Sequence, residues 1–116
     1  MAFQELSVAK ANLIFCLKLL GAYQARGLVH VVLCPGSRSG PLAIAAGRLS
    51  KNNDLKLTTC IDERSAAFFA LGLATATGNA TAVITTSGTA VAHLLPAAIE
   101  ADRSCQPLLL LTADRP

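Results

Sequence analysis

Four short apolar runs, each followed by a polar turn, constrain the fold of this chain most strongly. The runs cover Leu28–Leu33, Leu55–Ile61, Thr81–Thr85 and Leu108–Leu111. They begin about 25 to 30 residues apart, which leaves room for a crossover helix between successive runs. Short apolar runs bounded by glycine, serine or proline are typical of strands in a parallel sheet. The sequence therefore predicts an α/β fold, an open parallel sheet with helices on both faces.

The segment before the first run has the pattern of an amphipathic helix. Apolar residues recur there every three or four positions, at Leu6, Ala9, Leu13, Leu17 and Leu20. This spacing places them on one face of a helix, and Gly27 is suited to end it. Polar residues such as Lys10, Lys18 and Gln24 fall elsewhere on the predicted helix.

The three segments between the runs carry helix start and stop signals. Pro41 suits the first turn of a helix that continues through Leu49. Asp62 can cap a helix from Glu63 to Thr77, which Gly78 then ends. The last of these helices starts after Gly88 and runs towards Ala101, and Pro96 inside it predicts a kink or a split.

The predicted helix from Glu63 to Thr77 contains the stretch AAFFALGLATAT, which has almost no polar face. A helix that is apolar all round must be covered on every side. A lone domain of 116 residues provides too little structure to cover it. We therefore expect part of its surface to lie in a subunit interface, and we expect the isolated chain to self-associate.

The composition raises the question of a membrane. Apolar residues make up 53% of the chain and charged residues 15%, and no charged residue lies between Ser65 and Ile99. However, Gly72, Gly78 and Pro96 interrupt that stretch, so it lacks the roughly 20 continuous apolar residues of a spanning helix. We expect no transmembrane segment, and we interpret the composition as that of one part of a larger assembly.

The remaining composition narrows the class of protein further. The amino-terminal sequence lacks the basic and apolar regions of a secretory signal, so we expect a cytoplasmic protein. The four cysteines form no CxxC pair, which favours reduced thiols over a disulfide framework or a zinc site. The net charge of +3 comes without a basic run, which argues against a nucleic-acid partner.

Ligands of open parallel sheets gather beyond the carboxyl ends of the strands, at the turns into the helices. Four turns fall there, and they are rich in serine, threonine, glycine, arginine and carboxylates although the rest of the chain is apolar. They cover Cys34–Pro41, Asp62–Ser65, Thr85–Thr89 and Thr112–Pro116. This contrast predicts a binding site at the carboxyl edge of the sheet.

Each turn by itself also has an ordinary structural interpretation. Arg38 offers a planar fork for a carboxylate or phosphate, or it is a solvated arginine in a capped turn that lacks the GK[ST] ending of a phosphate-binding loop. Glu63 is a partly desolvated functional carboxyl, or a first-turn acid that complements the helix dipole. Arg115 pairs with a ligand carboxylate or with Asp114. We interpret His30 and His93 as structural.

Taken in order, the four turns resemble one family. The segments CPGSRSGPLAIAAGRL, IDERSAAFFALGLA, TTSGTAVAHLLPAAIEA and PLLLLTADRP are similar to successive motifs of the 2-succinyl-5-enolpyruvyl-6-hydroxy-3-cyclohexene-1-carboxylate synthases of menaquinone and phylloquinone biosynthesis. Pyruvate-type relatives such as acetolactate synthase carry an HEQ-like triplet and a TSGPG turn instead. This chain has Asp62-Glu63-Arg64 and Ser87-Gly88-Thr89 at those places. The resemblance implies a pyrimidine-binding domain of a thiamine-diphosphate enzyme.

The resemblance also implies roles for individual residues. Glu63 matches the glutamate that hydrogen-bonds N1′ of the aminopyrimidine, which makes it the catalytic residue of this chain. The implied cofactor-binding residues are Pro35, Gly36, Glu63, Ser87 and Gly88. The implied substrate-binding residues are Ser37, Arg38, Thr89 and Arg115. The reaction implied by the family decarboxylates 2-oxoglutarate and adds the product to isochorismate.

The chain departs from the family in length. Such synthases are several times longer, and they hold the cofactor's diphosphate and its Mg²⁺ or Mn²⁺ through a later domain with a GDG…N motif, which is absent here. The resemblance thus implies that residues 1–116 are the amino-terminal domain, without the central and diphosphate-binding domains. It also implies a homo-oligomer (a dimer or a dimer of dimers), and an isolated domain without activity. A stand-alone module that binds a partner through its apolar face is the alternative from another class.

Overall fold

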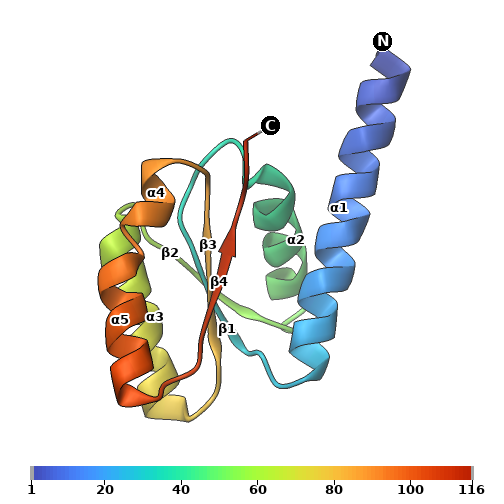
Figure 1. Cartoon of the computed structure of the whole chain (residues 1–116). Coiled ribbons are helices and arrows are strands. Elements are labelled where there is room, and N and C mark those ends of the chain that lie inside the picture. Colours follow the sequence, from blue (N-terminus) through green and yellow to red (C-terminus); the bar gives the residue numbers. More distant parts are fainter. Residues whose placement is uncertain (1, 116) are drawn as a thin grey trace.

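The computed structural model describes residues 2–115 of the chain, and the side chains of residues 7–115. Its centre is a sheet of four parallel strands in the order β2-β1-β3-β4 (Figure 1). The strands are β1 (His30–Leu33), β2 (Lys56–Thr59), β3 (Thr81–Thr85) and β4 (Leu108–Thr112). This open parallel sheet confirms the fold class that the four apolar runs predict.

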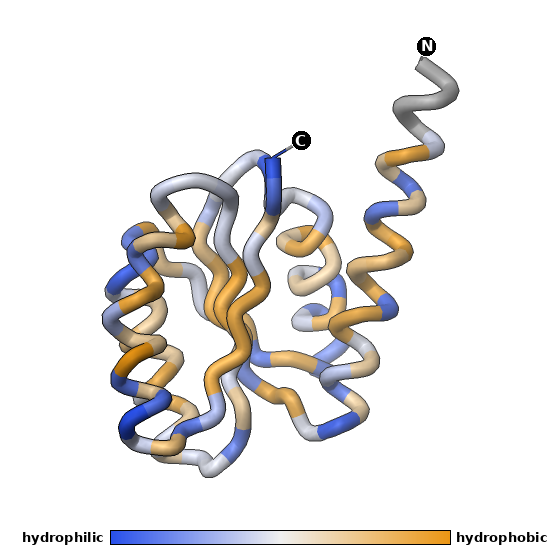
Figure 2. The backbone as a smooth tube through the Cα atoms, in the orientation of Figure 1, coloured by the Kyte–Doolittle hydropathy of each residue, from blue (hydrophilic) through white to orange (hydrophobic). Residues whose placement is uncertain are grey.

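Helices cover both faces of the sheet, as predicted. On one face lie α1 (Ala2–Ala25) and α2 (Gly40–Lys51), and on the other lie α3 (Glu63–Thr77), α4 (Thr89–Ala92) and α5 (Leu95–Ser104) (Figure 1). Successive side chains of a strand point to opposite faces. Val31 accordingly belongs to the core under α1 and α2, and Val32 belongs to the core under α3 and α5. The strands form the apolar centre of the molecule in Figure 2.

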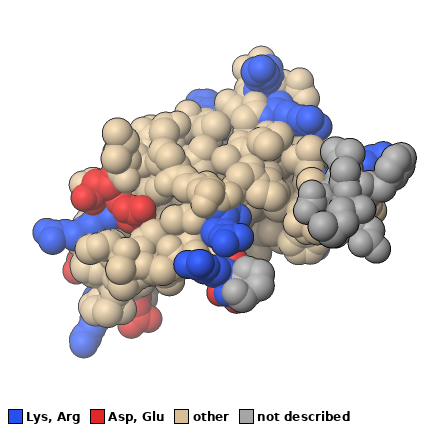
Figure 3. Space-filling model, turned by 90° about the horizontal axis from the view of Figure 1, so that it is seen from above, with Lys and Arg blue, Asp and Glu red and all other residues tan. Residues whose placement is uncertain are grey.

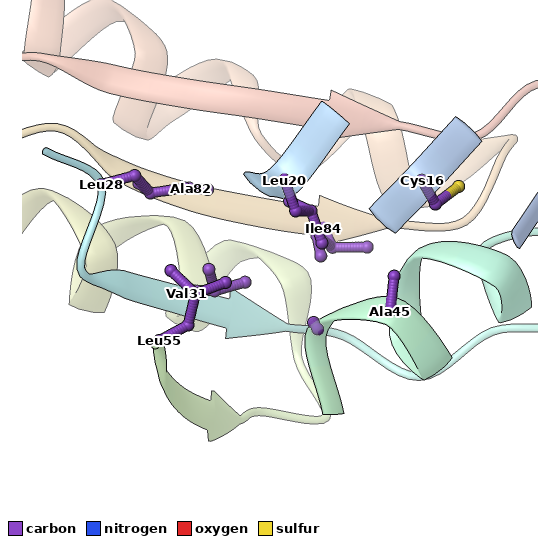
Figure 4. Close-up of a cluster of buried hydrophobic side chains, with 9 residues drawn as sticks. Cys16, Leu20, Leu28, Val31, Ala45, Leu55, Ala82 and Ile84 are labelled. Carbon is purple, nitrogen blue, oxygen red and sulfur yellow. The ribbon is translucent and has the colours of Figure 1, made fainter. Parts of the chain in front are cut away.

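Helix α1 meets the sheet only through its carboxyl half. Cys16 and Leu20 are buried there, and Leu20 points towards Ile84 of β3 (Figure 4). Leu13 and Leu17 pack at the edge of this core, whereas Ala9 is exposed. The predicted helix is present, and the part of its apolar face that packs on the core lies in the carboxyl half, because the amino half extends beyond the sheet (Figure 1). The side chain of Leu6 lies outside the described residues.

Helix α3 packs on the sheet through small side chains. Ala66, Ala67, Ala70 and Ala74 are fully buried against the strands and α5. The Asp62 carboxylate accepts the Ser65 N–H at 2.9 Å, and the chain leaves the helix through Gly78 at a φ of 72°. Both predicted ends of this helix are confirmed. Its outer face exposes Phe68 and Phe69, at 42% and 46%, and the subunit interface expected there stays a prediction.

Two other element boundaries refine the sequence analysis. The last predicted helix is split, with α4 ending at Ala92 and α5 beginning at Leu95, so Pro96 occupies the first turn of the second part. A proline is tolerated there because the first turn needs no N–H donor. The second strand is shorter than its apolar run, since Ile61 leaves the sheet and is 87% exposed. No helix within the described residues is both long and apolar enough to cross a membrane.

Candidate functional site at the carboxyl edge of the sheet

The strand order reverses between β1 and β3, at the centre of the sheet. The chain leaves β1 towards β2 on one side, and it leaves β3 towards β4 on the other side. In open α/β sheets such a reversal opens a crevice at the carboxyl ends of the two strands. The turn Cys34–Ser39 and the turn Thr86–Gly88 border this crevice. The fold thus brings together two of the turns that the sequence analysis singled out.

These two turns are in direct contact. A Cβ atom built on Gly36 would lie 2.4 Å from the Cβ of Thr86, closer than any side chain can approach. Glycine at position 36 therefore lets the β1–α2 turn rest on the β3–α4 turn. The family resemblance implies a site role for Gly36 but none for Thr86, because no local sequence pattern predicts a contact between residues 50 positions apart.

A buried side-chain hydrogen bond stabilises the β1–α2 turn. Ser39 is 1% exposed, and its hydroxyl donates to the Gly36 carbonyl oxygen at 3.2 Å. Ser39 occupies the N-cap position of α2, yet its side chain makes no capping bond because the hydroxyl closes the turn instead. Pro35, Ser37 and Arg38 are exposed on the outer side of this turn, where a ligand can reach them.

The β3–α4 turn has its own conformational requirement. Gly88 adopts a φ of 79° and a ψ of −138°, a region essentially reserved for glycine. Ser87 is half-buried, and Gly88 and Thr89 are exposed at the edge of the crevice. Helix α4 has only four residues, so its dipole adds little at this turn.

Asp62 and Glu63, the two acids at the start of α3, differ in their hydrogen bonding. Asp62 is exposed, and the Ser65 N–H that it accepts holds the pKa of its carboxyl below the ordinary value. The helix start therefore already has its capping acid. Glu63, the first residue of the helix, is half-buried and makes no side-chain hydrogen bond among the described residues. Its carboxyl remains available for a ligand.

A buried thiol lies at the same edge of the sheet as Glu63. Cys34 follows β1 and has no exposed surface. Burial first, and the acidic groups of Glu63, Cys60 and Asp62 next, raise the pKa of this thiol to about 11. Glu63 begins α3, which packs on β1 and β3, so both residues belong to the carboxyl edge of the sheet.

Arg38 lines a cleft of about 200 Å³ beside the crevice. The other residues of its wall come from α1, from the start of α2 and from the segment after β4: Asn12, Phe15, Cys16, Pro41, Leu42, Ala113 and Asp114. The Asp114 carboxylate accepts the backbone N–H of Arg115 at 2.8 Å. This bond uses the main chain of Arg115, so the pairing of its guanidinium with Asp114 or with a ligand stays a prediction. Arg115 is exposed and does not line this cleft.

Uncharged residues cover most of the carboxyl edge. Figure 3 looks down on this end of the molecule, where acidic and basic groups are scattered over an uncharged surface and some of them lie beside one another. Within residues 7–115 no three histidine, cysteine or carboxylate side chains are grouped so as to hold a metal ion. Among the groups at this edge are the half-buried carboxyl of Glu63, two glycine turns with hydroxyls, and the exposed guanidinium groups of Arg38 and Arg115.

The family described as "Thiamine pyrophosphate enzyme, N-terminal TPP binding domain" matches residues 18–116. This chain belongs to that family. The matched range includes every turn at the carboxyl edge of the sheet. The description of the family names thiamine pyrophosphate as the cofactor that this domain binds.

Relatives of known name sharpen the assignment. A synthase of Prochlorococcus marinus (strain MIT 9313), named 2-succinyl-5-enolpyruvyl-6-hydroxy-3-cyclohexene-1-carboxylate synthase, is 78% identical over 90 residues, or 78% of this chain and 16% of the relative. Synthases of the same name from Synechococcus sp. (strain WH7803) and P. marinus (strain NATL1A) are 72% identical over 100 residues and 63% over 111. These matches cover 86% and 96% of this chain, but only 17% and 19% of the relatives. They confirm the resemblance noted in the four turns, and the chain spans less than a fifth of the length of these relatives.

Proposed function

We propose that this chain forms the pyrimidine half of the active site in a thiamine-diphosphate-dependent synthase of menaquinone or phylloquinone biosynthesis. The reaction decarboxylates 2-oxoglutarate and adds the resulting four-carbon unit to isochorismate. One observation carries the proposal above the others. Glu63 is half-buried, makes no side-chain hydrogen bond among the described residues, and begins α3 at the carboxyl edge of the sheet, where Asp62 already caps the helix.

The residues at the crevice fit an aminopyrimidine ring. A half-buried carboxyl can hold a proton against a ring nitrogen, and the hydroxyls and glycine main chain around it suit a flat, neutral heterocycle. Glu63 shares its proton with N1′ of the ring, while Pro35, Gly36, Ser87 and Gly88 form the walls. When bound, thiamine diphosphate supplies the nucleophilic carbon that decarboxylation of a 2-oxo acid requires. The contribution of this chain is to set the ring's position and protonation.

Substrate recognition follows from the charges of the two acids. Both 2-oxoglutarate and isochorismate carry carboxylates, and guanidinium groups bind carboxylates through paired, charge-assisted hydrogen bonds. Arg38 and Arg115 are exposed on the carboxyl edge, as are Ser37 and Thr89, whose hydroxyls can donate to the same groups. We assign these four residues to the substrates.

A second subunit completes the site in this proposal. No three metal-ligating side chains are grouped within the described residues. In this proposal the diphosphate and its Mg²⁺ or Mn²⁺ are bound by another domain. Phe68 and Phe69 on the outer face of α3, and Ile61 just before it, are exposed large apolar side chains next to Glu63 in sequence. An interface there buries apolar surface and brings a partner's cofactor site towards Glu63. We place the assembled enzyme in the cytoplasm.

The proposal is tested with a chimera, because the chain spans less than a fifth of its relatives. This chain replaces the matching segment of the P. marinus NATL1A synthase, whose match covers 96% of it. The chimera is expected to convert 2-oxoglutarate and isochorismate to the synthase product. Glu63→Gln in the chimera is expected to lower kcat by about a thousandfold or more, because the neutral amide cannot exchange a proton with the ring.

Glu100→Gln is the matched control, since Glu100 is an exposed glutamate on α5 with no place at the crevice. It is expected to leave kcat unchanged. Near-normal turnover of the Glu63→Gln chimera, with its fold intact by circular dichroism, would refute the role of Glu63. A folded but inactive parent chimera would favour a stand-alone interaction module. Exclusive use of pyruvate would instead favour an acetolactate-synthase-like enzyme.

A further inference from the structure

One face of helix α1 packs on the sheet in its carboxyl half and lines a cleft in its amino half. Leu20 and Cys16 are one helical turn apart, and both are buried against the sheet. The next position on the same face, again four residues earlier, is Asn12. Asn12 belongs to the part of α1 that extends beyond the sheet, so its side-chain amide is exposed. The packed face of the helix therefore continues with a polar residue, which lines a cleft.

Asn12 shares that cleft with Arg38. Both side chains line the same space of about 200 Å³, together with Phe15 and Leu42 as apolar walls. Phe15 is 64% exposed, an unusual state for a large aromatic side chain beside a packed helix. A guanidinium and an amide over two apolar walls form a binding site for a carboxylate attached to a carbon skeleton.

Asp114 is the acidic residue of this cleft, and its orientation decides whether an anion can enter. Its Oδ1 accepts the backbone N–H of Arg115 at 2.8 Å, which ties the carboxylate to its own main chain. Within residues 7–115 the Arg38 guanidinium forms no ion pair, although the Asp114 carboxylate lines the same cleft. Arg38 therefore keeps its donors for a ligand.

We propose that Asn12 of α1 is a specificity-determining residue, whose side-chain amide donates a hydrogen bond to a substrate carboxylate held by Arg38. The proposal rests on the synthase function above and deepens it, since it adds helix α1 to the substrate site. The ligand class is a carboxylic acid with an apolar skeleton that packs on Phe15. The two substrates both provide this chemistry, and their separate Michaelis constants distinguish them.

The experiment uses the chimera with Asn12→Ala and Asn12→Asp, and measures kcat and KM for each substrate with the other saturating. Asn12→Ala is expected to raise the KM of one substrate about tenfold with little change in kcat, the effect of one lost hydrogen bond to a charged group. Asn12→Asp is expected to raise the same KM further, because its carboxylate repels that of the ligand. The substrate whose KM rises is the one held in this cleft.

Ala11→Asp supplies the control, because Ala11 is exposed on the same helix and does not line the cleft. It introduces the same charge one position away and is expected to leave both KM values unchanged. The proposal is overturned if both KM values of Asn12→Asp stay within about twofold of the parent, or if kcat alone falls. An inactive parent chimera would instead count against the synthase function itself, so the two failures are separable.

Discussion

Helices α3 and α1 lie on opposite faces of the same sheet, and they are held there in different ways. α3 has fully buried alanines from its first turn to its last, and it has a side-chain cap at Asp62 and a glycine stop at Gly78. α1 is anchored by Cys16, Leu20 and neighbouring leucines in its carboxyl half, and its described amino half is exposed except at the edge of the core.

The difference matches the tasks that we assign to the two helices. A carboxyl that must exchange a proton with one ring atom has to be fixed in place, and Glu63 begins the helix that is packed throughout. The residues of α1 that line the cleft, Asn12 and Phe15, stand on the less supported part. In the proposed assembly they gain their final surroundings from the ligand and from other parts of the enzyme.

The largest expected effect breaks the packing of α3. Ala70→Leu places three extra carbon atoms where no surface is exposed, against strands on one side and α5 on the other. We expect it to lower the free energy of unfolding by about 3 kcal/mol, because α3 must move away from the sheet. Urea denaturation of the chain measures this loss.

Ala11→Leu on α1 is the matched substitution, and it is expected to change the free energy of unfolding by less than about 0.5 kcal/mol, since Ala11 is exposed. Equal losses for the two variants would show that the helices are supported alike. That result would remove the contrast between them.

A smaller effect is expected at the contact between the two central turns. Gly36→Ala forces its Cβ against that of Thr86, and we expect a loss of about 2 kcal/mol on thermal unfolding. Adding Thr86→Gly removes the opposing atom and is expected to recover most of the loss. Gly21→Ala in α1, where a Cβ meets nothing within 4 Å, is expected to stabilise by up to about 1 kcal/mol. A Gly36→Ala variant as stable as the parent would contradict the contact.

Much of the fold is predictable because its signals are local. The apolar runs give the strands, Asp62 and Gly78 give both ends of α3, and Pro96 gives the break before α5. The strand order has no such signal, since it depends on which strands pair after the chain crosses over. The contact of Gly36 with Thr86 follows from that order and could not be predicted without it.

In the candidate site, too, some residues could be predicted from local sequence signals and others could not. The turns at the strand ends were predictable from their glycines, serines and charges, and the structure groups them at one edge. Asn12 and Phe15 carry no motif, and they join Arg38 only because α1 overhangs the sheet. Ser39 looks like a helix cap in the sequence, but it closes the preceding turn because its side chain is buried.

The central claim is that the Glu63 carboxylate faces the end of β1, and the Cys34 thiol reports on it directly. In the folded chain the pKa of Cys34 is raised from 9.0 to about 11, by burial first and by Glu63 next. A nearby negative charge disfavours the thiolate, so removing that charge lowers the pKa. The measurement is an NMR titration of the Cys34 ¹³Cβ resonance in the parent chain, in Glu63→Gln and in Glu100→Gln.

We predict that the Cys34 pKa moves back towards 9.0 in Glu63→Gln and keeps its parent value in Glu100→Gln. The folded state of each variant is verified from its amide spectrum at the same pH values. An unchanged Cys34 pKa in a folded Glu63→Gln chain would contradict the account, because it would mean that this carboxylate points away from the strand ends.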